Sequence, residues 1–147
     1  MYRKIVVALQ EKGTDEAIVA HVRSLAALHG ARVTLLRVVA NGSRGGDGLG
    51  HLLQMEIGTS GCERKERARA YVAQLERRLR LQGCRVETAI VVGTRCEAEA
   101  IVHFADESGC DLVAMPSDTR PWLLRALKGD TASKVQRKAT VPTLFVH

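Results

Sequence analysis

The stretch RVETAIVVGTRCEAEAIVHFADESGCDLVAM, residues 85–115, contains the pattern that decides the fold. It opens with a run rich in β-branched residues at Arg85–Val92, which predicts a strand, and a glycine-threonine pair then turns the chain. Apolar residues at helical spacing predict a helix over about Arg95–Ser108, which Gly109 ends. A second strand is predicted at Asp111–Met115. A strand, a helix and a strand in this order form a unit whose two strands lie parallel.

The same alternation extends over the rest of the chain. Further apolar runs predict strands at Lys4–Leu9, Arg32–Val39 and Val141–Val146, the last opened by a proline. Gly30 and Gly83 resemble Gly109 in standing just before a strand, where they end a helix. The helices predicted between these strands are the following: one with its N-cap at Gly13-Thr14-Asp15 and a stripe of Ile18, Val22, Leu25 and Leu28; one at Cys62–Gln82 with a buried stripe of Ala68, Tyr71, Val72, Leu75 and Leu79; and one near Thr131–Arg137.

This order predicts a single α/β domain over residues 1–147, with a doubly wound five-stranded parallel sheet and helices on both faces. Residues 41–61 contain seven glycines in 21 positions, and we interpret them as a flexible connection. Ligands of such sheets bind beyond the carboxyl ends of the strands. The candidate site segments are therefore Gln10–Thr14, the loop from Ala40, Gly93–Arg95 and Pro116–Asp130.

Charge and composition exclude several classes of protein. The net charge is +6, and residues 63–85 hold eight basic and three acidic side chains, which we interpret as a solvated helix face. Nucleic-acid binding by residues 64–80 is the less favoured alternative, because acidic residues are interspersed and no aromatic platform accompanies them. The four cysteines include no C-x-x-C pair, and the five histidines have no metal-ligand spacing. Without a membrane-length apolar run or a signal-peptide pattern, we expect a cytoplasmic protein.

Four stretches of the chain resemble the universal stress protein family: MYRKIVVAL, HGARVTLLRVV, GTRCEAEAIVHFADESGCDLVAMPS and GDTASKVQRKATVPTLFVH. The resemblance covers essentially the whole chain apart from the glycine-rich connection. It implies the α/β fold of that family, which resembles the adenine nucleotide alpha hydrolases. It also implies a homodimer formed through the last strand, whose residues here are Thr143, Leu144, Phe145 and Val146. Pairing is physically reasonable because that apolar strand is expected at an edge of the sheet.

ATP-binding members of that family carry G-x-x-G-x9-G-[S/T] after the fourth strand and an Asp at the end of the first. When the motif is aligned with this chain, its first two glycines fall on Pro116 and Thr119, and its third on Gly129. Asp130 stands where Ser or Thr is expected, and Gln10 replaces the Asp of the first strand. The resemblance therefore implies a degenerate nucleotide site, with these candidate residues: Gln10, Val39, Pro116, Ser117, Thr119, Arg120, Gly129, Asp130 and Thr131.

The chemistry of these replacements favours loss of ATP binding in the family manner. Pro116 has no N–H donor and a fixed φ, and Thr119 places a branched side chain where a backbone must approach phosphates. Asp118 and Asp130 add negative charge beside the expected triphosphate. We therefore predict a non-catalytic regulatory module of the stress response, without a cofactor, which binds a protein partner or a small ligand of unknown identity.

The alternative hypothesis is a nucleotide-binding switch or slow ATPase. Arg120, Lys128, Gly129 and Thr131 would then retain ATP with Mg²⁺. Trp122 lies in the same loop, and we favour a role in plugging the nucleotide pocket or contacting a partner over a role in stacking on a base. A catalytic site is not expected, because no nucleophile elbow or paired histidine accompanies Ser117.

Overall fold

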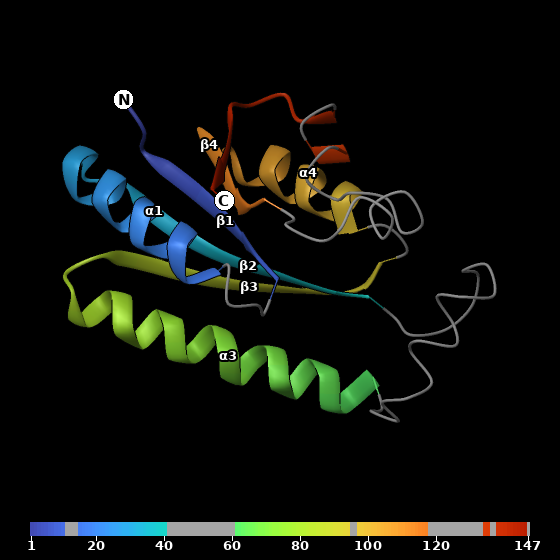
Figure 1. Ribbon diagram of the computed structural model, residues 1–147. Coiled ribbons are helices and arrows are strands. Elements are labelled where there is room, and N and C mark those ends of the chain that lie inside the picture. The colour runs from blue at the N-terminus through green and yellow to red at the C-terminus, as the bar shows by residue number, and fades with distance from the viewer. Residues whose placement is uncertain (11–14, 41–60, 95–96, 118–133, 136–137, 147) are drawn as a thin grey trace.

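The computed structural model describes residues 1–10, 15–40, 61–94, 97–117, 134–135 and 138–146. Figure 1 shows the arrangement of its helices and strands. Their bounds are β1 (Lys4–Leu9), α1 (Asp15–His29), β2 (Arg32–Ala40), α3 (Gly61–Leu81), β3 (Arg85–Thr94), α4 (Glu97–Ser108), β4 (Leu112–Pro116) and β5 (Thr143–Val146). A helix is predicted near Thr131–Arg137, and the helical residues described there are Lys134, Val135 and Lys138. The glycine-rich connection lies outside the described residues up to Ser60.

The five strands form one sheet in the order β3-β2-β1-β4-β5, and every neighbouring pair is parallel. This confirms the predicted doubly wound sheet. The helices α1 and α3 cover one face of the sheet and α4 covers the other (Figure 1). The winding direction therefore reverses between β1 and β4, because the chain runs outward through β2 and β3 and then returns to the far side of β1.

Burial of β1 on both faces holds the layers together. Ile5, Val7 and Leu9 face α1 and α3, whereas Val6 and Ala8 face α4, and none of these five side chains is more than 2% exposed. A fully buried aliphatic side chain of this size contributes about 1.5–3 kcal/mol to folding. The continuous apolar run therefore has the burial that its sequence predicts for a central strand.

The glycines predicted to end helices do so. Gly30, Gly83 and Gly109 have φ angles of +65°, +83° and +62°, the left-handed conformation of a helix C-terminus. At the first of them, the amide of Ala31 returns to the carbonyl of Ala26 at 3.1 Å, and the chain enters β2 two residues after the helix ends. This geometry explains the short connections before β2, β3 and β4.

Two predicted turns belong to strands instead. β3 continues through Gly93 to Thr94, because it stays paired with β2 as far as Ala40. β4 continues to Pro116, which pairs with Val146 of β5. A proline is tolerated there because β1 pairs with β4 only as far as Ala114, so the missing N–H would have had no acceptor on that side.

The buried stripe of α1 also differs from the predicted one. Ile18 and Val22 are buried as predicted, but Leu28 is 77% exposed and Val19 and Ala26 complete the buried face. Leu28 lies about a third of a turn away from the face that holds these buried residues, because successive helix residues are rotated by about 100°. By contrast, Ala68, Val72, Leu75 and Leu79 of α3 form the predicted buried stripe.

Asp111 connects the starts of the two central strands. Its carboxylate accepts the backbone N–H groups of Arg3 and Lys4, at 2.6 and 2.9 Å, and its own N–H donates to the carbonyl of Lys4 at 2.9 Å. These backbone donors, with the charge of Arg3 nearby, lower the pKa of the Asp111 carboxyl below its usual value of 3.8. Asp111 thereby fixes the amino ends of β1 and β4 against each other.

We predict a pH-dependent contribution from this contact. Because the pKa of Asp111 is lowered by folding, its stabilising effect is complete well above pH 3.8 and is lost as the pH falls through the lowered pKa. The Asp111→Asn variant should be less stable than the wild type in urea denaturation at neutral pH, and the difference should shrink in acid. Glu107→Gln is the control, since it removes a carboxylate that is 72% exposed. A difference that stays constant between neutral and acidic pH would contradict the assignment.

Candidate functional site

The carboxyl ends of β2, β1 and β4 form the edge of the sheet where the winding direction reverses. These three strands are neighbours, so their last residues lie at one edge of the sheet. Gln10 follows β1 directly, Val39 is the second-last residue of β2, and Pro116 ends β4. This is the position at which doubly wound sheets bind their ligands.

The structure brings four of the predicted site residues to this edge. Gln10 is partly buried, Val39 is 6% exposed, and Pro116 and Ser117 are buried at the end of β4. Five others lie outside the described residues, as do Asp118, Trp122 and Lys128: Thr119, Arg120, Gly129, Asp130 and Thr131. The described part of the site is therefore the floor formed by the strand ends.

A buried carboxylate occupies the junction between β1 and α1. Asp15 is fully buried in the first turn of α1, and its two oxygens accept the backbone N–H of Gln10 at 3.0 and 3.1 Å. The start of a helix is where backbone dipoles favour a negative charge. In this protein the negative charge comes from the chain itself, beside the strand end where a bound anion would otherwise lie.

Tyr71 holds that carboxylate from the opposite helix. Its hydroxyl donates to Oδ2 of Asp15 at 2.7 Å, and this contact joins α3 to α1 across 56 residues of sequence. A short hydrogen bond to an ionised, buried acceptor is stronger than one between neutral groups. Asp15 is therefore held from both β1 and α3, which orders the β1–α1 junction.

The backbone donors at the end of β4 are likewise occupied or missing. Pro116 has no N–H, and the N–H of Ser117 donates to the carbonyl of Val146 at 2.8 Å. Together with the bond from Gln10 to Asp15, these contacts leave no backbone N–H available at residues 10, 116 and 117. A phosphate cradle needs several such donors aimed at one point.

The positive charge of Arg37, which lies near this edge on β2, is paired with a carboxylate. Arg37 stands beside Leu9 in the strand register, with a side chain only 17% exposed. Its guanidinium donates to the carbonyl of Val38 and lies 3.6 Å from the Glu97 carboxylate at the start of α4. This ion pair reduces the positive charge that the described edge presents to an anionic ligand.

Sequence reasoning missed Asp15 and Tyr71 as site residues. The local pattern places Asp15 at the N-cap of α1 and Tyr71 in the buried stripe of α3, and neither position indicates a role at the carboxyl edge. One signal was present: Tyr71 is one of two tyrosines and lies among charged residues in α3, where a buried hydroxyl needs a partner. Its partner, however, lies 56 residues away in the sequence.

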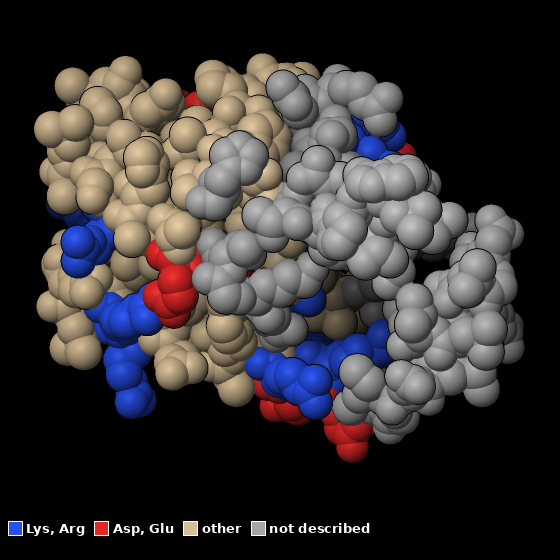
Figure 2. Space-filling model, viewed as in Figure 1, with Lys and Arg blue, Asp and Glu red and all other residues tan. Residues whose placement is uncertain are grey.

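The other sequence candidates are surface or packing residues where they are described. The basic side chains along α3 outnumber the acidic ones interspersed among them, and Figure 2 shows blue and red groups together along the lower edge of the molecule. Arg69, Arg78 and Arg80 form ion pairs with Glu66, Glu16 and Glu76. His103 is 71% exposed, and Cys110 is buried as a free thiol whose pKa burial raises.

The described ranges contain neither a metal-binding cluster of side chains nor a helix suited to crossing a membrane. No three His, Cys, Asp or Glu residues within these ranges stand close enough together to hold a metal ion. None of the described helices combines the length and the apolar character needed to cross a membrane.

Comparison with known proteins gives one consistent match. A family model described as "Universal stress protein family" matches residues 1–147. The universal stress protein MJ0577 of Methanocaldococcus jannaschii is 26% identical over 159 residues, which covers 99% of this chain and 95% of that protein. Among solved structures, the universal stress protein UspA of Lactobacillus plantarum has a TM-score of 0.77 at 19% identity, covering 99% and 98% of the two chains. The universal stress protein of Archaeoglobus fulgidus in complex with dAMP has a TM-score of 0.71 at 21% identity, covering 99% and 98%.

The hydrogen bond between Tyr71 and Asp15 can be tested by removing one atom. We predict that Tyr71→Phe lowers the free energy of unfolding by about 1–2 kcal/mol, because a buried carboxylate loses a donor. Tyr2→Phe makes the same chemical change where the ring packs against His29, and it should cost less. Urea denaturation of both variants gives the comparison. Equal costs for the two variants would show that the Tyr71 hydroxyl does not stabilise the junction.

Proposed function

Because this chain belongs to the universal stress protein family, we propose that it is a cytoplasmic, non-catalytic binding module of the stress response that does not hold ATP in the family manner. Its carboxyl edge would receive a small ligand with little negative charge, or a segment of a protein partner. The stress role comes from the family. The ligand preference comes from the chemistry of the described strand ends.

One observation carries this proposal: the chain's own groups take up the anion-binding features of the edge. The Asp15 carboxylate lies at the start of α1 and accepts the N–H of Gln10. A triphosphate carries several negative charges, and a buried carboxylate beside it would repel it unless a cation intervened. Pro116 and Ser117 then offer no free N–H groups at the end of the neighbouring strand.

The second candidate function is a nucleotide-binding switch, and one comparison favours it. The similar universal stress protein of A. fulgidus was solved in complex with dAMP, a nucleotide with a single phosphate. A monophosphate needs fewer donors than a triphosphate, so loss of phosphate-binding groups affects it less. In this candidate, Arg120, Lys128, Gly129 and Thr131 supply the phosphate contacts and Mg²⁺ accompanies ATP.

Calorimetry with ATP–Mg²⁺, ADP and AMP separates the two candidates. We predict that the carboxyl edge does not bind ATP–Mg²⁺ with the low micromolar Kd of a family-type site, which would saturate at ligand concentrations of about 100 μM. We also expect the purified, denatured protein to release no adenine nucleotide. Low micromolar binding of ATP–Mg²⁺ would overturn the proposal, and AMP binding without ATP binding would favour the monophosphate form of the switch.

Restoring the family motif provides a matched test with a gain of function. The triple variant Pro116→Gly, Thr119→Gly and Asp130→Ser returns the motif's residues to this chain, and we expect it to bind ATP–Mg²⁺ more tightly than the wild type does. Thr140→Gly is the control, because it adds a glycine at an exposed position on another segment. Failure of the triple variant to gain ATP affinity while it stays folded would mean that these replacements are not the cause.

We also propose that two copies of the chain pair through β5. This strand lies at the end of the sheet order, with β4 on one side only, and all four of its residues are partly exposed. An apolar edge strand exposes backbone groups to a second copy. Static light scattering at micromolar concentration should therefore give twice the chain mass of 16.0 kDa. A mass equal to one chain would contradict the dimer.

A further inference from the structure

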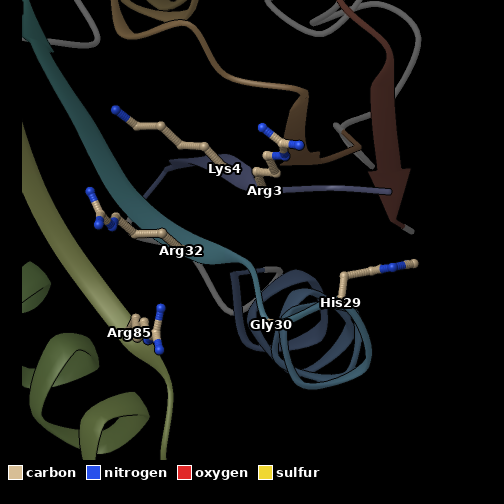
Figure 3. Close-up of a pocket in the computed structure, with 6 residues that line it drawn as sticks. All are labelled: Arg3, Lys4, His29, Gly30, Arg32 and Arg85. Carbon is tan, nitrogen blue, oxygen red and sulfur yellow. The ribbon is translucent and has the colours of Figure 1, made fainter.

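The opposite edge of the sheet, where the strands begin, carries a row of cations. Lys4 of β1 pairs in register with Arg32 of β2, which pairs in turn with Arg85 of β3. Residues in register on parallel strands project from the same face, and neighbouring strands lie about 4.8 Å apart. Three positive side chains therefore stand side by side on adjacent strands. Figure 3 shows them at the starts of these strands.

These cations line a hollow of about 360 Å³ together with Arg3, Gly30 and His29. The space beside Gly30 is open, because a Cβ added there would meet no atom within 4 Å. Figure 3 shows the imidazole of His29 directed away from Lys4 and Arg32, and its ring packs edge-on against Tyr2 at 5.4 Å. The groups that can bind a ligand in the hollow are therefore the lysine and the arginines.

The charges around the hollow do not cancel. Arg32 forms an ion pair with Glu87 at 3.1 Å, and Lys4 donates to the carbonyl of Ser108 at the end of α4. The Asp111 carboxylate is bound by two backbone N–H groups rather than by a side chain. Among the described residues, no hydrogen bond or ion pair engages the guanidinium groups of Arg3 and Arg85. Four cationic side chains thus face two carboxylates.

Like charges in register repel one another, and this repulsion costs stability unless a counter-ion relieves it. The position of Lys4 is explained by the C-terminus of α4, because its ammonium group donates to a carbonyl there and cations are stabilised at the ends of helices. It does not explain why Arg32 and Arg85 continue the row outward over two more strands. Guanidinium groups form two parallel hydrogen bonds with phosphate oxygens, so a row of them suits a ligand with phosphates in a line.

We propose that this amino edge binds a short linear polyphosphate, either free or as the terminal phosphates of a nucleotide. Lys4, Arg32 and Arg85 have backbone positions that span about 10 Å at the strand spacing, and their long side chains would converge on the oxygens of the phosphate chain. Arg3 adds positive charge at the rim of the hollow. The site is independent of the proposed function, because it lies at the end of the sheet opposite to Gln10 and Pro116.

Titration with inorganic tripolyphosphate, followed by calorimetry and by amide chemical shifts, tests the proposal. Wild-type protein should bind with submillimolar Kd, and the largest shifts should fall at the starts of β1, β2 and β3 rather than at their carboxyl ends. The variant Arg32→Gln with Arg85→Gln should weaken binding about tenfold or more, because two charge-assisted contacts are lost. Both side chains are exposed, so the core is unchanged.

The matched control is Arg67→Gln with Arg77→Gln, which removes the same charge from exposed positions on α3. It should change affinity by no more than about twofold. Glu87→Gln removes the carboxylate that competes with the ligand for Arg32, so this variant should bind tripolyphosphate more tightly than the wild type does. A folding defect would weaken binding and could not produce this result. Equal weakening by both arginine pairs, shifts confined to the carboxyl edge, or no tripolyphosphate binding would overturn the proposal.

Parallel titrations with ATP and with tripolyphosphate distinguish the two sources of the phosphates. If the affinities for ATP and for tripolyphosphate fall by about the same factor in the Arg32→Gln, Arg85→Gln variant, the edge recognises the phosphate chain alone. If ATP binds more tightly than tripolyphosphate and shifts the same amides, the nucleotide is the physiological source. If ATP changes the amide chemical shifts of Gln10 and Ser117, and these changes persist in the variant, then ATP binds at the carboxyl edge. The amide shifts therefore distinguish binding at the two edges.

Discussion

The two-sided burial of β1 is the constraint on which the rest of the structure depends. A strand with apolar residues on both faces can bury all of them only in the middle of a sheet that has helices on both sides. Once β1 is central, β2 and β4 take its two edges, and the chain must reverse its winding between them. The position of the candidate site, the opposed helix layers and the exposed outer strands all follow from that placement.

The two edges of the sheet have opposite electrostatic characters. At the carboxyl edge, where this architecture usually offers donors and dipoles to an anion, a buried carboxylate and an arginine-glutamate pair have taken those positions. At the amino edge, where helix carbonyls end, cations accumulate instead. Among the described residues, cationic side chains therefore gather at the amino edge of the sheet rather than at the carboxyl edge.

The sequence was informative where structure depends on local pattern. Apolar runs placed all five strands, and glycines at three helix ends fixed where the helices stop, because both signals act over a few residues. The role of Asp15 could not be predicted, since its partner Tyr71 belongs to another helix and the contact exists only after both pack on the sheet. Pro116 was misplaced for a related reason: whether a proline ends a strand depends on how far the neighbouring strand extends.

The contact between Asp111 and the start of β1 also bears on how the chain folds during synthesis. It joins residues 108 positions apart, and β4 supplies the second neighbour of the central strand. Pairings of such long sequence separation form slowly, and domains complete only when the required segments have emerged. Of the five strands, β1 emerges before the others and waits longest for its neighbours, with apolar side chains on both faces. Until β4 emerges, one edge of β1 lacks its partner strand.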